Sequence, residues 1–247
     1  MNNQESKQVR NDLNISGMST TAGGVYRDVR IDGMAKVNGD LDCVSLRING
    51  TLGMKGSVKS EEITVNGMGT IDGPVESKEI RIDGMFTLKG EVRCTDLDVN
   101  GKSKIEGRLQ GDKINIGGEV TVKGDVQCEA FETEGNIKLE GLLNAETVDI
   151  RLHSLSTVKE IGCERIDVRR IERGGGFGFL KNFSLMGGPR LKVDLIEGDD
   201  IFLEDTEADT VRGTRVYLGR GCKIRRVEYR ESLQTDDDTV IGQSLQV

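Results

Sequence analysis

Apolar and polar residues alternate along this chain in a pattern that returns every seventeen residues. Val29, Arg30 and Ile31 are followed one repeat later by Leu46, Arg47 and Ile48. Alternation with a period of two is typical of a β-strand with one buried face. We therefore predict short strands whose inward side chains stack on those of the next repeat.

Glycine marks the same repeat. A period of fixed length indicates a solenoid, and seventeen residues are too few for a pair of helices. We predict an all-β fold, a single-stranded β-helix with coils of about 17 residues. Asp32 and Asn49 each precede a glycine, so Asp-Gly and Asn-Gly dipeptides are expected to turn the chain with left-handed backbone angles. The structural turn glycines are Gly33, Gly50, Gly67, Gly84, Gly101, Gly118 and Gly135.

The period divides the chain into five segments. The regular β-helix is expected at residues 13–171, in about nine coils, and further solenoid coils of shorter period at residues 191–230. A Gly/Phe-rich loop at 172–190 separates them. We expect a flexible N-terminal tail at residues 1–12 and an acidic, mobile tail at residues 231–247.

The loop at 172–190 is too apolar for an ordinary exposed loop. Either it packs on the solenoid, or it inserts into a membrane or a partner. We expect packing, because surface-binding elements usually carry more basic residues than this loop does. The residues concerned are Phe177, Phe179, Leu180, Phe183, Leu185 and Met186.

Composition narrows the choice of partners and location. Aromatic residues make up 4% of the chain and Trp is absent, which suits a narrow aliphatic interior. The net charge is −8 and no basic stripe with interleaved aromatics occurs, so no nucleic acid is expected. There is no apolar run of about 18 residues and no signal-peptide core at the start, which predicts a cytoplasmic protein.

The chain offers little catalytic chemistry. Its one histidine, His153, lies in an irregular coil, and we predict neither an enzyme nor a cofactor. Cys43, Cys94 and Cys128 share one position of the repeat, two or three coils apart, which is too far for a disulfide. Buried, unpaired thiols without a metal are expected. The apolar spacings of two, four, two, four and five also differ from the equal six-residue steps of hexapeptide acyltransferases.

A β-helix exposes unpaired backbone groups at each end, and uncovered strand edges recruit other strands. The polar residues before Leu13 show no amphipathic period that would form a capping helix. We therefore expect end-to-end self-association through an end layer made of Leu13, Ile15, Val29 and Ile31.

The coils VRIDGMAKVNGDL, ITVNGMGTIDGPV and IRIDGMFTLKGEV resemble those of the bactofilins, bacterial polymer-forming cytoskeletal proteins. The resemblance covers residues 13–171. It implies a right-handed β-helix and nucleotide-independent, non-polar filaments. It also implies a scaffold for cell-envelope, shape or motility machinery, often at the inner face of the membrane.

We therefore expect a structural scaffold whose main partner is itself, as a homo-oligomer or filament. We also expect cell-envelope or motility proteins as partners, and peripheral association with the membrane. The alternative is a non-polymerising adaptor, a monomer or dimer that binds an envelope or motility partner, because the extra C-terminal segment could cap one end. A hexapeptide-like acyltransferase is the third alternative.

Overall fold

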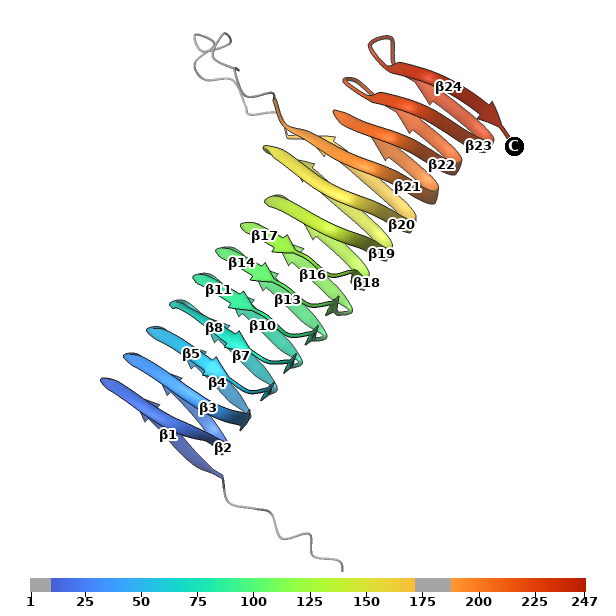
Figure 1. The fold of residues 1–247 in the computed structure, drawn as a ribbon. Coiled ribbons are helices and arrows are strands. Elements are labelled where there is room, and N and C mark those ends of the chain that lie inside the picture. Colours follow the sequence, from blue (N-terminus) through green and yellow to red (C-terminus); the bar gives the residue numbers. More distant parts are fainter. Residues whose placement is uncertain (1–9, 172–187) are drawn as a thin grey trace, which may run out of the picture.

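The protein is an elongated rod of stacked coils. A computed structural model describes residues 10–171 and 188–247. These residues form a parallel β-solenoid of about 13 turns, with the first and last coils at opposite ends of the rod (Figure 1). The predicted all-β solenoid is confirmed. The six apolar residues between Phe177 and Met186 lie outside the described residues.

Strands account for the regular structure of the described chain, which contains no helix. Several are long because they continue around a corner of the coil. They are β1 (Asn11–Ile15), β2 (Met18–Ile31), β3 (Met34–Asp42), β4 (Ser45–Ile48), β5 (Thr51–Lys55), β6 (Val58–Lys59), β7 (Glu62–Val65), β8 (Met68–Asp72), β9 (Val75–Glu76), β10 (Glu79–Ile82), β11 (Met85–Leu88), β12 (Val92–Arg93), β13 (Asp96–Val99), β14 (Lys102–Ile105), β15 (Leu109–Gln110), β16 (Lys113–Ile116), β17 (Glu119–Val122), β18 (Val126–Thr133), β19 (Asn136–Leu152), β20 (Leu155–Arg170), β21 (Arg190–Leu203), β22 (Thr206–Leu218), β23 (Lys223–Thr235) and β24 (Val240–Gln246).

Each coil of the regular region contributes a strand to three parallel ladders. One runs through β4, β7, β10, β13 and β16, the second through β5, β8, β11, β14 and β17, and the third through β6, β9, β12 and β15. Partners are seventeen residues apart, as with Ile31 and Ile48. Inward side chains therefore stack directly on their equivalents.

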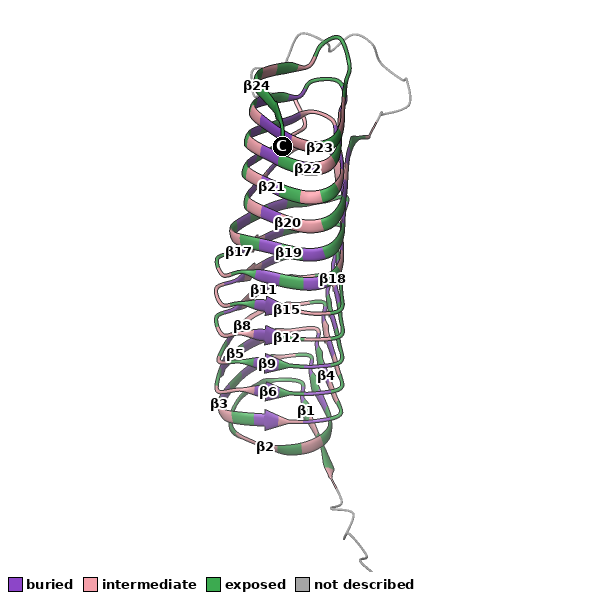
Figure 2. Cartoon of the chain, turned by 90° about the vertical axis from the view of Figure 1, so that its right-hand side faces the viewer, coloured by how far each residue is buried: buried purple, intermediate pink, exposed green. Residues whose placement is uncertain are grey.

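The core is a set of aliphatic columns that run along the rod. Ile31, Ile48 and Ile82 in one column are all fully or almost fully buried. Burial alternates with exposure along each strand, so buried segments of successive coils line up (Figure 2). Each buried aliphatic side chain contributes about 1.5–3 kcal/mol, and the stacking of neighbouring coils holds the rod together.

The seven glycines before the second ladder lie in bends between strands, but the left-handed backbone predicted for them is absent. None of the seven has a left-handed backbone; positive φ occurs at Gly39, Gly56, Gly221 and Asp205. Instead, a Cβ atom on Gly50 would lie 2.0 Å from the carbonyl oxygen of Gly33. Glycine is required here because successive coils approach too closely for a side chain.

The coils after residue 188 continue the same columns, at first with a period of fifteen or sixteen residues and in the last coil with a period of seventeen. Ile201 pairs with Val216 and Leu203 pairs with Leu218, both fifteen residues apart. The prediction of a mobile tail at residues 231–247 was wrong. Strand β24 pairs with β23 and stacks Ile241 on Ile224, so the apolar column extends into the last coil.

Candidate functional site

The first coil of the described chain leaves one strand edge open. Among the described strands, β1 pairs only with β2, and residues 18–25 of β2 pair only with β3. Residues 11–25 therefore have a neighbouring coil on one side. Their outward-directed N–H and C=O groups are free to pair with another strand.

The predicted end layer forms two stacked pairs. Leu13 lies on Val29, and Ile15 lies on Ile31. Leu13 is half-buried, Ile15 is 6% exposed, and the two residues beneath them are buried. The structure brings all four together at the N-terminal end, and their part in assembly remains a prediction.

The N-terminal coil lacks charged side chains. No Asp, Glu, Lys or Arg occurs in residues 13–26, although these residues make up 31% of the chain. Solenoids and sheets that remain monomeric place charges or proline on such edges to block strand addition. Between residues 13 and 26 this edge has neither.

The C-terminal coil also leaves a strand edge open. Among described strands β24 pairs only with β23, and residues 239–247 contain no charged side chain. Leu233 and Ile241 pack partly against the core, while Thr235 and Ser244 continue two columns with polar side chains. Both ends are thus open, with an apolar part and a polar part. The last coil is uncharged along β24, but its first half carries Arg230, Glu231 and the acidic residues 236–238.

Ion pairs beside the N-terminal edge fasten its first coil. Arg27 Nη2 lies 2.7 Å from an Asp12 carboxylate oxygen, and Arg10 Nη1 lies 2.9 Å from one of Asp42. Asp12 and Arg27 sit at the two boundaries of the uncharged stretch. They hold the coil in place and leave its edge free.

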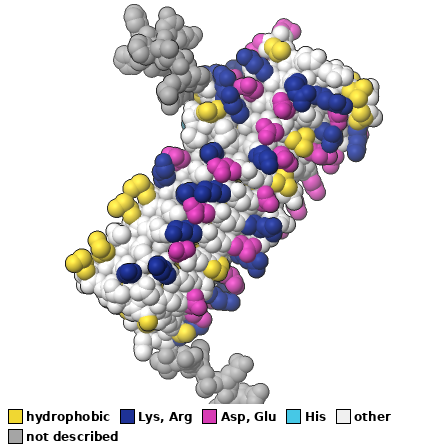
Figure 3. Space-filling model, in the orientation of Figure 1, with side chains coloured by type: hydrophobic (Ala, Val, Ile, Leu, Met, Phe, Trp, Pro, Cys, Tyr) yellow, Lys and Arg dark blue, Asp and Glu magenta, His cyan; other side chains and the backbone are white. Residues whose placement is uncertain are grey.

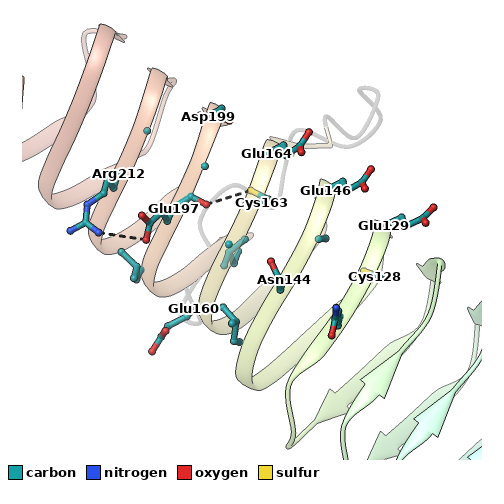
Figure 4. Close-up of a pocket in the computed structure, with 18 of the residues that line it drawn as sticks. Cys128, Glu129, Asn144, Glu146, Glu160, Cys163, Glu164, Glu197, Asp199 and Arg212 are labelled. Carbon is teal, nitrogen blue, oxygen red and sulfur yellow. Dashed lines mark hydrogen bonds and ion pairs between the residues drawn. The ribbon is translucent and has the colours of Figure 1, made fainter. Parts of the chain in front are cut away.

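A groove along another corner is lined by three of the five cysteines, Cys94, Cys128 and Cys163. Cys128 stacks on Ala145, which stacks on Cys163, and Gly198 and Gly213 continue this small-residue floor (Figure 4). All five cysteines of the chain have free thiols. Burial raises the pKa of the thiols of Cys94, Cys128, Cys163 and Cys222 to about 12, so reactive thiolates are disfavoured at neutral pH.

One wall of this groove is a column of acidic side chains. Glu129, Glu146 and Glu164 occupy equivalent positions of successive coils and point the same way (Figure 4). No described side chain forms an ion pair or hydrogen bond with them. In the part of the chain that the structure describes, no group of three His, Cys, Asp or Glu residues could hold a metal. His153 is exposed.

Sequence reasoning located the N-terminal end but missed three features. It did not use the missing charge in residues 13–26 and 239–247, which was visible in the sequence. It did not place Cys163 in the cysteine column, because one inserted residue changes the spacing there. It also assigned the C-terminal edge to a mobile tail.

Comparison with known proteins identifies the family. The Bactofilin family model, described as polymer-forming cytoskeletal, matches residues 5–93 and 77–159, two overlapping stretches of the repeat. The chain belongs to the bactofilin family. This bactofilin is 55% identical to the uncharacterized protein YhbE of Bacillus subtilis over 233 residues, which cover 94% of the chain and 96% of YhbE.

A second relative is matched over a shorter stretch. This bactofilin is 39% identical to the uncharacterized protein YhbF of Bacillus subtilis over 89 residues, which cover 36% of the chain and 34% of YhbF. No solved structure matches. The described part of the chain has no helix that is long and apolar enough to cross a membrane. The family is structural and cytoskeletal rather than enzymatic.

Proposed function

We propose that this bactofilin is a cytoplasmic scaffold that assembles end to end by strand addition, without a nucleotide. The carrying observation is that both terminal coils are open and that residues 13–26 and 239–247 on their edges carry no charged side chain, while the coils between them are rich in charge. Strand addition at these edges would pair the free backbone groups and cover Leu13 and Ile15. The resulting polymer would organise cell-envelope, shape or motility machinery, as a bactofilin scaffold.

The N-terminal end is tested by placing a charge in its layer. Ile15→Lys puts an ammonium group into the apolar part of the interface, and Ser19→Lys puts one on the exposed part of the same coil. Both variants are expected to remain monomers or small oligomers in sedimentation velocity and negative-stain microscopy. The wild-type protein is expected to form larger assemblies without ATP or GTP.

The matched control is Asn115→Lys. It adds the same charge to an exposed outward position in the middle of the rod, between Asp98 and Glu132 in the same column. This variant should assemble as the wild type does. Melting curves would check that each variant is folded. If Ile15→Lys is unfolded, Ser19→Lys still tests the N-terminal end. A wild-type protein that stays monomeric at high concentration in low and high salt would show the proposal to be wrong.

A further inference from the structure

Four of the seven methionines form an exposed column on the N-terminal half of the rod. Met18 stacks on Met34, Met34 on Thr51, Thr51 on Met68 and Met68 on Met85. Their exposed fractions are 85%, 53%, 49% and 53% for Met18, Met34, Met68 and Met85. Figure 3 shows hydrophobic side chains gathered along this edge of the rod. Large apolar side chains in one row on a surface indicate an interaction site.

A shallow groove lies beside this column. Its floor is low at Gly53, where an added Cβ would have no atom within 4 Å. Met18, Met34, Thr51 and Thr70 contribute to its lining, so methyl and thioether groups face the groove. We call the methionine column and this groove the methionine face.

The net charge of the methionine face is positive, although the whole chain carries −8. Lys36 and Lys55 line the groove and form no ion pair with any described residue. Lys89 and Asp72 also line it, and they pair with each other at 3.3 Å. Two lysines therefore remain available to an anionic partner.

We propose that the methionine face binds the apolar side of an acidic amphipathic helix from a partner protein. The column spans four coil steps, or about 19 Å at roughly 4.8 Å per step. A helix of about 13 residues has the same length. An apolar stripe on such a helix would cover the methionines, and acidic residues flanking the stripe would meet Lys36 and Lys55.

The methionines suit this occupant because their unbranched side chains adapt to different apolar shapes. A second copy of this chain fits less well. Two methionine faces brought together by a two-fold axis would place lysines of both copies at one interface, where like charges repel. Met18 lies in the terminal coil, but Met34, Met68 and Met85 lie on the side of the rod behind it and remain accessible when the ends are occupied.

The test uses the full-length protein and a labelled synthetic peptide of about 18 residues that places Leu along one helical face and Glu on the other. Fluorescence anisotropy is expected to show saturable binding that weakens as salt is raised. A peptide with Lys in place of Glu should not bind. Lys36→Glu combined with Lys55→Glu should weaken binding of the acidic peptide by about tenfold or more, as should Met34→Glu combined with Met68→Glu.

The matched control combines Lys159→Glu with Lys223→Glu. Both lysines are exposed, lie outside the methionine face and form no ion pair with a described residue, so net charge changes equally. This control should bind the peptide as the wild type does. No peptide binding, or equal loss in the control and in the Lys36/Lys55 variant, would overturn the proposal.

A membrane is the competing occupant. Vesicles containing about 30% phosphatidylglycerol present an anionic surface to the same lysines. The proposal would also be overturned if the wild-type protein sedimented with these vesicles, the Lys36/Lys55 variant did not, and the acidic peptide did not bind. Assembly by sedimentation velocity should be unchanged in both methionine-face variants, which separates this site from the rod ends.

Discussion

Gly67 lies so close to Gly50 of the preceding coil that a Cβ atom at residue 67 would be 1.9 Å from the Gly50 carbonyl oxygen. The NH groups of Asn66 and Gly67 both donate to the Ile48 carbonyl, so this turn is held against the coil before it. The glycine column therefore sets how closely successive coils stack.

Gly67→Ala is expected to destabilise the protein by about 3 kcal/mol, because the backbone must move to accommodate the methyl group. Thermal melting followed by circular dichroism would show a lower Tm. Gly53→Ala is the matched control, since that position has open space and should change stability by less than about 0.5 kcal/mol. Equal melting temperatures for the two variants would contradict this role of the glycine column.

Ser103 is 2% exposed, and its hydroxyl has no hydrogen-bond partner among the described residues. Its neighbours in the column are Phe86 and Val120. Ser103→Ala should stabilise the protein by about 1 kcal/mol, because an unsatisfied polar group is removed from the core.

Ser60 provides the comparison for this prediction. Its hydroxyl donates to the carbonyl oxygens of Val44 and Glu62, at 3.1 and 2.8 Å. Ser60→Ala should therefore lower the Tm, whereas Ser103→Ala should raise it. A decrease in both variants would show that the Ser103 hydroxyl makes a stabilising interaction.

Glu146 stands between Glu129 and Glu164 in the acidic column. Like charges in directly stacked strand positions repel, so Glu146→Gln should raise the Tm at low ionic strength. The increase should shrink as salt is added, because exposed charges are screened over about 10 Å at 0.1 M salt. A salt-independent increase would point to strand propensity rather than charge as its cause.

Glu228 is buried and accepts a 2.7 Å hydrogen bond from Arg212 Nε, which lowers the pKa of its carboxyl group. A lowered pKa in the folded state stabilises the fold above the unfolded pKa of about 4.3, and this stabilisation is lost as pH falls through the folded pKa. Glu228→Gln should therefore reduce the Tm at pH 7, with a difference that disappears in acid.

The comparison residue for Glu228 is Glu231. Its side chain is 61% exposed in its pair with Arg215, so Glu231→Gln should change the Tm little at any pH. A pH-independent difference between wild type and Glu228→Gln would mean that shape and hydrogen bonding, rather than charge, explain the effect.

The core of the solenoid could be predicted from the sequence because every coil must place apolar side chains at the same inward positions. Ile31 and Ile48 must both face inward, since each forms part of the surface on which the next coil packs. The last coil was missed because Thr235 and Ser244 interrupt two apolar columns, although its residues lie seventeen after their partners in the preceding coil. The apolar periodicity of the sequence weakens in a terminal coil, because no further coil packs on its outer side.

The candidate sites were harder to infer because they depend on how residues combine across coils. Met18, Met34 and Met68 are separated in the sequence by many charged residues, and only the register shows that they share a column. The spacing also suggested a turn role for Gly67, but its real constraint is the carbonyl oxygen of another coil.

The hydrogen bonds between coils have a mechanical consequence. Met34 N donates to Gly17 O and Thr51 N donates to Gly33 O, so backbone bonds of this kind join each coil to the one before it. Tension applied to the two ends would load successive coil interfaces in series. The rod should yield one coil at a time, and each coil of seventeen residues would release up to about 58 Å of chain. Such a rod should therefore lengthen in steps before it breaks.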